Sequence, residues 1–134
     1  ADLASPSMIW KGHGTVLIID DEETVRAITA RMAEHLGYLV DLASDGLEGV
    51  QKFRETPDRF SLVILDLTMP HMDGVEVFRE LRRIRPGIQV LLMSGFNEQE
   101  AINQFVGKGL AGFIQKPFTL EKLVQKLREI SSPT

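Results

Sequence analysis

LVILDLTMPHMDG, residues 62–74, joins an apolar run to a carboxylate and then to two residues that interrupt regular structure. The run Leu62 to Leu65 is typical of a strand that is covered on both faces of a sheet. Pro70 and Gly74 indicate that the chain turns after this strand. Asp66 therefore stands at the end of a buried strand, where a charge is costly unless a ligand or an opposite charge compensates it.

The same pattern of a short apolar run followed by a helical stretch recurs along the chain. The apolar runs are TVLIID, YLVDLA, SLVILD, QVLLMS and GFIQK. This alternation is typical of a parallel sheet with crossover helices. The second and fifth runs contain Asp41 and Gln115, so we expect them at the edges of the sheet. With right-handed crossovers, the sequence predicts an α/β fold of the flavodoxin-like (βα)5 type, a three-layer sandwich whose five-stranded parallel sheet has the order 2-1-3-4-5.

Apolar stripes and start signals predict the helices. The stripes are Val25, Ile28, Met32 and Leu36; Ala101, Ile102, Phe105 and Val106; and Leu120, Leu123, Val124, Leu127 and Ile130. Gly37 suits the left-handed position that closes the first of these helices. Three pairs have the spacing of a capping box, namely Asp45 with Glu48, Asp73 with Glu76, and Asn97 with Glu100.

The composition restricts the class of protein. With 134 residues, 43% of them hydrophobic, the chain has the size and core of one domain. A net charge of −4, with both signs interspersed, argues against direct binding of nucleic acid. There is no run long enough for a membrane span, no signal pattern and no cysteine, which favours a cytoplasmic setting without membrane contact. Residues 1–14 are expected to be a linker or an expression remnant, 15–131 the domain and 132–134 a tail.

Polar groups follow four of the five predicted strands. They are Asp20 and Asp21 after the first strand, Asp66 after the third, Ser94 after the fourth and Lys116 after the fifth. Because the strands are parallel, these groups should meet at one edge of the sheet. Three crowded carboxylates call for a hard cation, and Mg2+ suits such a site. Asp66 could also attack phosphorus, while Mg2+ and Lys116 hold the phosphoryl oxygens and Ser94 donates a hydrogen bond.

Each of these residues also has a simpler explanation. Asp20 and Asp21 could cap the following helix as readily as bind a metal. Ser94 precedes a glycine and could be a turn residue, and Lys116 could be a solvated strand end. The histidines, His13, His35 and His71, have no metal-ligand spacing. The joint placement of the polar groups at successive strand ends is what favours a site.

Four segments resemble motifs of the receiver domain of two-component response regulators: VLIIDDEE, LVILDLTMPHMDG, VLLMSG and FIQKPF. The resemblance extends from about Thr15 to Ile130. It implies that Asp66 is the phosphoacceptor and that Asp21 binds Mg2+, or Mn2+ in its place, directly. It further implies that Asp20 acts on the metal through water and that the backbone carbonyl of Thr68 completes the metal site.

The same resemblance implies a switch. Ser94 matches the switch hydroxyl, Phe113 the switch aromatic and Lys116 the phosphate-binding lysine, whose bond to Pro117 is expected to be cis. Phosphorylation would draw Ser94 and Lys116 toward Asp66 and turn Phe113 inward. The face formed by the fourth helix, the fifth strand and the fifth helix, called α4-β5-α5 in this family, would then change shape. Two further positions, Thr68 and Phe96, flank the path of hydrolytic water, and an aromatic at 96 predicts slow self-dephosphorylation.

Longer segments resemble receivers at the carboxyl ends of hybrid sensor histidine kinases: GHGTVLIIDDEETVRA, LLMSGFNEQEA and GKGLAGFIQKPF. This implies a histidine kinase domain, in the same chain, as phosphoryl donor, and a histidine phosphotransfer protein as acceptor. The domain would catalyse its own phosphorylation and dephosphorylation without being a turnover enzyme. The alternatives are a free-standing single-domain response regulator and a phosphorylation-independent scaffold.

Two other classes fit the sequence less well. A haloacid dehalogenase-type phosphatase requires a second aspartate two residues after the nucleophile, where this chain has Thr68. A flavodoxin-like cofactor binder requires a phosphate-binding loop rich in glycine and hydroxyl groups, and the sequence has none.

Overall fold

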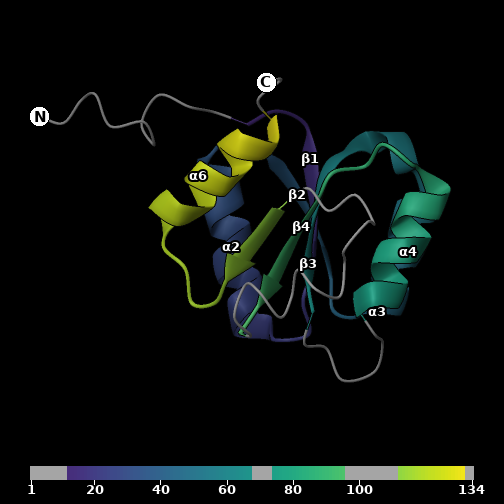
Figure 1. The fold of residues 1–134 in the computed structure, drawn as a ribbon, viewed down its shortest axis with the longest axis horizontal. Helices are drawn as coiled ribbons and strands as arrows, with labels where there is room; N and C mark the ends of the chain where they lie inside the picture. Colours follow the sequence, from purple (N-terminus) through teal and green to yellow (C-terminus); the bar gives the residue numbers. More distant parts are fainter. Residues whose placement is uncertain (1–11, 68–73, 96–111, 132–134) are drawn as a thin grey trace, which may run out of the picture.

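Strands and helices alternate along the chain in the computed structural model, which describes residues 12–67, 74–95 and 112–131 (Figure 1). The strands are β1 (Thr15–Ile19), β2 (Leu39–Ala43), β3 (Phe60–Asp66), β4 (Val90–Ser94) and β5 (Gly112–Gln115). The helices are α2 (Glu23–His35), α3 (Gly46–Glu55), the 3-10 turn η2 (Pro57–Arg59), α4 (Gly74–Ile84) and α6 (Leu120–Ser131). The stripe expected on residues 101–106, between β4 and β5, lies outside the described residues.

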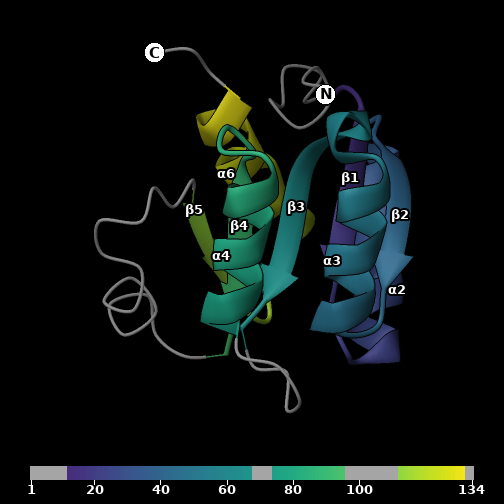
Figure 2. The same ribbon diagram turned by 90° about the vertical axis from the view of Figure 1, so that its right-hand side faces the viewer.

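The five strands form one parallel sheet in the order β2-β1-β3-β4-β5, as Figure 2 shows from right to left. This confirms the predicted order and the edge positions of the second and fifth strands. Helices α2 and α6 cover one face of the sheet, and α3 and α4 cover the other (Figure 1). The fold is therefore the predicted three-layer sandwich.

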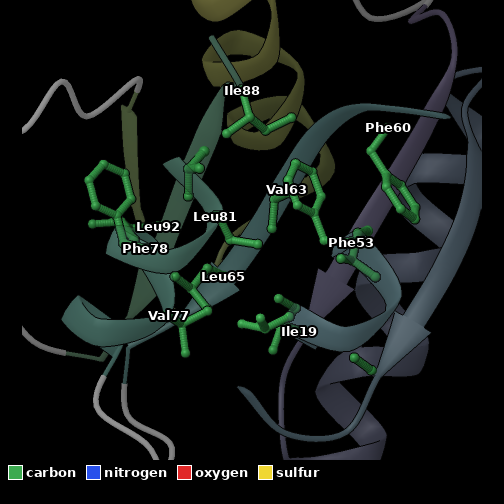
Figure 3. Packing of buried hydrophobic residues seen from close by; sticks show 14 of the residues in the cluster. Ile19, Phe53, Phe60, Val63, Leu65, Val77, Phe78, Leu81, Ile88 and Leu92 are labelled. Carbon is green, nitrogen blue, oxygen red and sulfur yellow. The ribbon is translucent and has the colours of Figure 1, made fainter. Parts of the chain in front are cut away.

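The core consists of two apolar layers separated by the sheet. Alternate residues of β1 enter opposite layers, with Leu17 and Ile19 facing α3 and α4 and Ile18 facing α2 and α6. In the first layer Phe53 of α3 stacks on Phe60 at the start of β3, with ring centroids 5.8 Å apart (Figure 3). Side chains buried on both faces explain why the central strands read as continuous apolar runs.

Helix α2 packs on the predicted stripe at Leu36 and, in part, at Met32, but not at Ile28. Ile28 is 49% exposed, whereas Ala30 and Ala33 are buried against the sheet together with Leu36. The buried hydroxyl of Thr29 donates to the carbonyl of Val25 at 2.8 Å, which satisfies it inside the helix. The stripe of large residues therefore included one exposed position and missed two alanines of the contact face.

Helix ends agree with the sequence more closely. Gly37, just after α2, has φ +101°, the left-handed conformation predicted for it. The Asp45 carboxylate accepts a hydrogen bond from the Glu48 N–H at 2.8 Å and so caps α3. The Glu48 carboxylate, however, accepts from the N–H and hydroxyl of Ser44 rather than from the N–H of Asp45. The return bond of the capping box therefore goes to Ser44, one residue before the expected Asp45. The caps expected at Asp73 and Asn97 lie outside the described residues.

The stripe predicted for the last helix is confirmed. Leu123, Val124 and Leu127 of α6 are buried, and Leu120 and Ile130 are partly buried against the same layer.

The end of the predicted linker contacts the domain. The Gly12 N–H donates to the Leu36 carbonyl at 2.7 Å, and the Gly14 carbonyl accepts from the Leu39 N–H at 3.0 Å. Residues 12–14 therefore lie against the end of α2 and the start of β2, while residues 1–11 are outside the described chain.

Candidate metal site at the carboxyl edge of the sheet

The predicted polar residues that the structure describes meet at one edge of the sheet. Asp66 is the last residue of β3 and pairs in register with Met93 of β4, next to Ser94. Asp20 and Asp21 follow β1 directly, on the other side of β3. Asp20, Asp66 and Ser94 are at most 1% exposed. The parallel sheet thus brings together side chains that are far apart in the sequence.

Three carboxylates form the centre of the site. Asp20, Asp21 and Asp66 each offer an oxygen atom, and these atoms lie within 4.8 Å of one another. Asp20 and Asp66 are buried and Asp21 is exposed, so the cluster opens to solvent on the Asp21 side. Carboxylate oxygens at this spacing are the donors that a hard divalent cation such as Mg2+ or Mn2+ prefers. The residues present therefore fit the metal that the sequence predicts.

Lys116, which follows β5, provides the positive charge. Its ammonium lies 3.3 Å from Asp20 Oδ2 and 3.3 Å from Asp66 Oδ1, and its side chain is 14% exposed. Glu22 Oε1 is a third, more exposed partner at 3.7 Å. Four carboxylates, those of Asp20, Asp21, Glu22 and Asp66, surround a single ammonium, so negative charge is in excess and a divalent cation would reduce it.

The protonation equilibria reflect this crowding. Burial raises the pKa of the Asp20 carboxyl, and the charge of Asp66 adds to the effect; the Glu22 N–H and Lys116 oppose it without cancelling it. Burial alone would lower the pKa of Lys116, but the charges of Asp66 and Asp20 outweigh it and raise the pKa. The raised pKa of Asp20 follows mainly from burial, and the raised pKa of Lys116 from the two carboxylates beside it.

The loop between β1 and α2 fixes the orientation of Asp20. The Asp20 N–H donates to the Ala43 carbonyl at 3.1 Å, and Asp20 Oδ1 accepts from the Glu22 N–H at 2.9 Å. Oδ2 is left to face Lys116, and it accepts no hydrogen bond from the part of the chain that is described. An oxygen buried in this way retains a lone pair for a cation or for water bound to one.

Some of the remaining predicted residues are described by the structure, and others lie outside the described residues. The Lys116–Pro117 peptide bond is cis, the Lys116 N–H donates to the Ser94 carbonyl at 2.8 Å, and Phe113 is buried in the layer covered by α3 and α4. Thr68 and Phe96, expected to supply a ligand carbonyl and to adjust the phosphoryl lifetime, lie outside the described residues.

Sequence reasoning missed two residues near the site. Glu22 approaches Lys116, and the guanidinium of Arg26 donates to the Asp20 carbonyl at 2.8 Å. Glu22 had a signal, since it directly follows the acidic pair. Arg26 had none, because its contact reaches back six residues from the body of α2 to a main-chain oxygen.

One observation concerns the membrane. Among the described residues, no helix has the length and apolarity needed to cross a bilayer.

The chain is similar in sequence to one much longer protein and to one protein of about its own length. It is 34% identical over 119 residues to the sensor kinase CckA of Brucella abortus, covering 89% of this chain but only 13% of CckA. It is 32% identical over 118 residues to the chemotaxis protein CheY of Thermotoga maritima, covering 87% of this chain and 96% of CheY. The chain therefore spans a small part of one relative and nearly the whole of another.

Solved structures agree with the fold. The structure of a CheX-CheY-BeF3-Mg2+ complex from Borrelia burgdorferi matches with a TM-score of 0.78 and 29% identity, over 87% of this chain and 88% of that one. The family model described as the response regulator receiver domain matches residues 16–128. This match covers the sheet from the second residue of β1 onward and the strand-end residues described above, and the chain belongs to the response regulator receiver domain family.

Proposed function

We propose that this receiver domain accepts a phosphoryl group on Asp66, in a cytoplasmic two-component phosphorelay, with Mg2+ as cofactor. The observation that carries the proposal is the position of Asp66. It is a buried carboxylate that shares a cluster with Asp20 and Asp21 and lies 3.3 Å from the ammonium of Lys116. A carboxylate in these surroundings is poised to react where charge on a phosphoryl group can be neutralised.

The proposed reaction is a displacement at phosphorus. An Asp66 oxygen forms a bond to the phosphorus atom while the bond from phosphorus to the donor's imidazole nitrogen breaks, and that nitrogen keeps the electron pair. The carboxylate is already a nucleophile, so the step needs no general base. A bound Mg2+ would be held by Asp21 and Asp66 directly, by Asp20 through water and by the Thr68 carbonyl, and would neutralise charge on the phosphoryl oxygens. Lys116 and Ser94 would pair with the remaining oxygens.

The proposed output is a shift in a conformational equilibrium. Phosphorylation adds about 1.5 to 2 negative charges at Asp66. Lys116 and Ser94 are the groups that respond, because one already lies against Asp66 and the other ends the neighbouring strand. Since Lys116 follows β5, its movement would change the surface of β5 and α6, together with the helix expected between β4 and β5, which lies outside the described residues. Phe113, which is buried on β5, would change its surroundings in this shift.

The donor proposed is a sensor histidine kinase, with the domain as a segment of a hybrid kinase that passes the phosphoryl group to a histidine phosphotransfer protein. Similarity to the sensor kinase CckA supports this. Similarity to CheY over nearly its whole length supports the alternative, a free-standing response regulator. The mass of the endogenous protein separates the two, since a free-standing protein would run near 15.0 kDa and a hybrid kinase at several times that mass.

The experiment is intact mass spectrometry after incubation with Mg2+ and a small acyl phosphate. We expect the wild type to gain the mass of one phosphoryl group, the Asp66→Asn variant to gain nothing, and EDTA to abolish the gain. Asp41→Asn is the matched control, because Asp41 is a partly buried carboxylate of β2 that pairs with Lys52 and Arg59 away from the site.

An adduct on Asp66→Asn would contradict the assignment of the phosphoacceptor. No adduct on the wild type, with no binding of beryllofluoride, would favour the phosphorylation-independent scaffold. Once the adduct is formed, its decay tests the role proposed for Thr68 and Phe96: we expect slow hydrolysis, and a half-life of seconds would contradict it.

A further inference from the structure

Arg26 connects helix α2 to the loop that carries the acidic pair. Its Nη1 donates to the main-chain carbonyl of Asp20 at 2.8 Å, and its own N–H donates to the Glu22 carbonyl at 2.9 Å. The guanidinium is therefore anchored through the first turn of the helix and reaches back across the loop. The side chain is half-buried, which protects the hydrogen bond from competition with water.

Asp21 is the only residue of the loop between these anchored positions. Asp20 is held by its N–H bond to Ala43 and by the Glu22 N–H on its carboxylate. Asp21 is exposed, and in the part of the chain that is described no hydrogen bond holds its carboxylate. Its place in the cluster thus depends on the backbone of the two residues that flank it, which fixes the direction of its Cα–Cβ bond.

We propose that Arg26 is a positioning residue for the metal site: by holding the Asp20 carbonyl, it fixes the turn that presents the Asp21 carboxylate to the cation. The inference rests on the proposed function, because it concerns the affinity of the same site for Mg2+. Groups that orient ligands without touching the metal typically change metal affinity by about 10- to 100-fold when they are removed.

The positive charge of Arg26 makes the direction of the change in Mg2+ affinity informative. A guanidinium near the carboxylate cluster repels a divalent cation, so its removal by electrostatics alone would strengthen Mg2+ binding. Loss of the hydrogen bond would release the loop and weaken binding. The two effects have opposite directions, and the positioning role therefore predicts weaker binding in spite of the loss of a positive charge.

The experiment is calorimetric titration of the whole chain with Mg2+ at fixed ionic strength. We expect Arg26→Met to raise the Kd for Mg2+ by about tenfold. Arg31→Met is the control for charge, because Arg31 is an exposed arginine of the same helix, one turn further from the loop. Its Kd should equal that of the wild type or be slightly lower.

Arg85→Met is the control for structure. Arg85 also donates to main-chain carbonyls, those of Pro57 and Phe60, but at the opposite end of β3 from Asp66. This variant should lose stability in EDTA and keep the wild-type Kd for Mg2+. It separates a positioning role from a general loosening of the fold.

The outcomes are distinct. A Kd for Arg26→Met within twofold of the wild type, or an equal rise in Kd for Arg85→Met, would overturn the inference and leave the proposed function intact. Absence of saturable Mg2+ binding by the wild type would overturn both. A rise in Kd confined to Arg26→Met would support the positioning role.

Discussion

The ammonium of Lys116 lies 3.3 Å from Asp66 Oδ1 and 3.3 Å from Asp20 Oδ2, so one cation bridges the carboxylate that ends β3 and the carboxylate that follows β1. The two carboxylates belong to adjacent strands, and Lys116 follows the edge strand β5 on the far side of β4. Any new charge on Asp66 changes what this ammonium faces. The bridge therefore connects Asp66, the proposed phosphoacceptor, to β5 and to the helix α6 that follows it.

Lys116→Ala should separate phosphorylation from the conformational response. The variant keeps the Asp66 carboxylate and the other carboxylates proposed to hold Mg2+, so we expect the acyl phosphate to form. The cation that the phosphoryl group would draw inward is absent, and the amide resonances of Phe113 and Ile114 in β5 should not shift on phosphorylation. NMR with the beryllofluoride mimic measures this. Lys122→Ala, an exposed lysine of α6, is the control, and a normal shift in Lys116→Ala would refute the coupling.

Mg2+ should stabilise the fold through the carboxylate cluster. A ligand at 100 times its Kd stabilises a native state by about 2.7 kcal/mol. We expect Mg2+ to raise the melting temperature of the wild type by several degrees, and an equal ionic strength of NaCl to have a much smaller effect. Asp21→Asn removes an exposed carboxylate of the cluster without disturbing the core, and it should lose most of the Mg2+ increment. An unchanged increment in that variant would exclude Asp21 as a ligand.

Asp41 should contribute stability that depends on pH. Burial alone would raise the pKa of its carboxyl, but the Lys52 ammonium and the Leu42 N–H outweigh it, with help from Arg59, and the pKa is lowered from 3.8. For a carboxyl whose pKa is lower in the folded state, the stabilisation is complete above the unfolded pKa. It is lost as the pH falls through the folded value.

We therefore expect Asp41→Asn to cost about 1 kcal/mol at pH 7 and much less at an acidic pH below the folded-state pKa of Asp41. Urea unfolding of both proteins at the two pH values provides the measurement. Asp58→Asn, at an exposed carboxyl of η2, is the control and should cost little at either pH. A penalty for Asp41→Asn that persisted in acid would mean that packing, not charge, explains it.

Gly49→Ala should destabilise the domain although alanine favours a helix. A methyl group at Gly49 of α3 would collide with the buried side chain of Ile19, the residue before Asp20. Overpacking of a core costs about 1–3 kcal/mol, which exceeds the gain of about 1 kcal/mol in helix propensity. Gly87→Ala meets no atom within 4 Å and is the control. Equal unfolding free energies for the two variants would show that Ile19 moves aside without cost.

The order of the strands was predictable because each edge strand shows its position in its own composition. Asp41 in the second run and Gln115 in the fifth mark strands that have one side open to solvent, and the structure places both at the edges. The strand-end residues could be found in the same way, since parallel strands bring their carboxyl ends to one edge.

The contact face of α2 could be read only in part from periodicity. Met32 and Leu36 of the predicted stripe do pack on the sheet, but Ile28 is exposed, and Ala30 and Ala33 are buried in the contact face. Which of two neighbouring faces is buried depends on the space between the helix and the strands, and that space is a property of the assembled layers.

By itself, the sequence determined the three-layer fold, the sheet order and the set of polar groups at the strand ends, because these follow from local composition and from the geometry of parallel strands. Only the tertiary structure decided how those groups face one another. The position of Lys116 between Asp20 and Asp66, and the bond from Arg26 to the Asp20 carbonyl, join segments whose separation in sequence carries no signal. Such contacts depend on side-chain reach and on main-chain oxygens, which become fixed only when the layers pack.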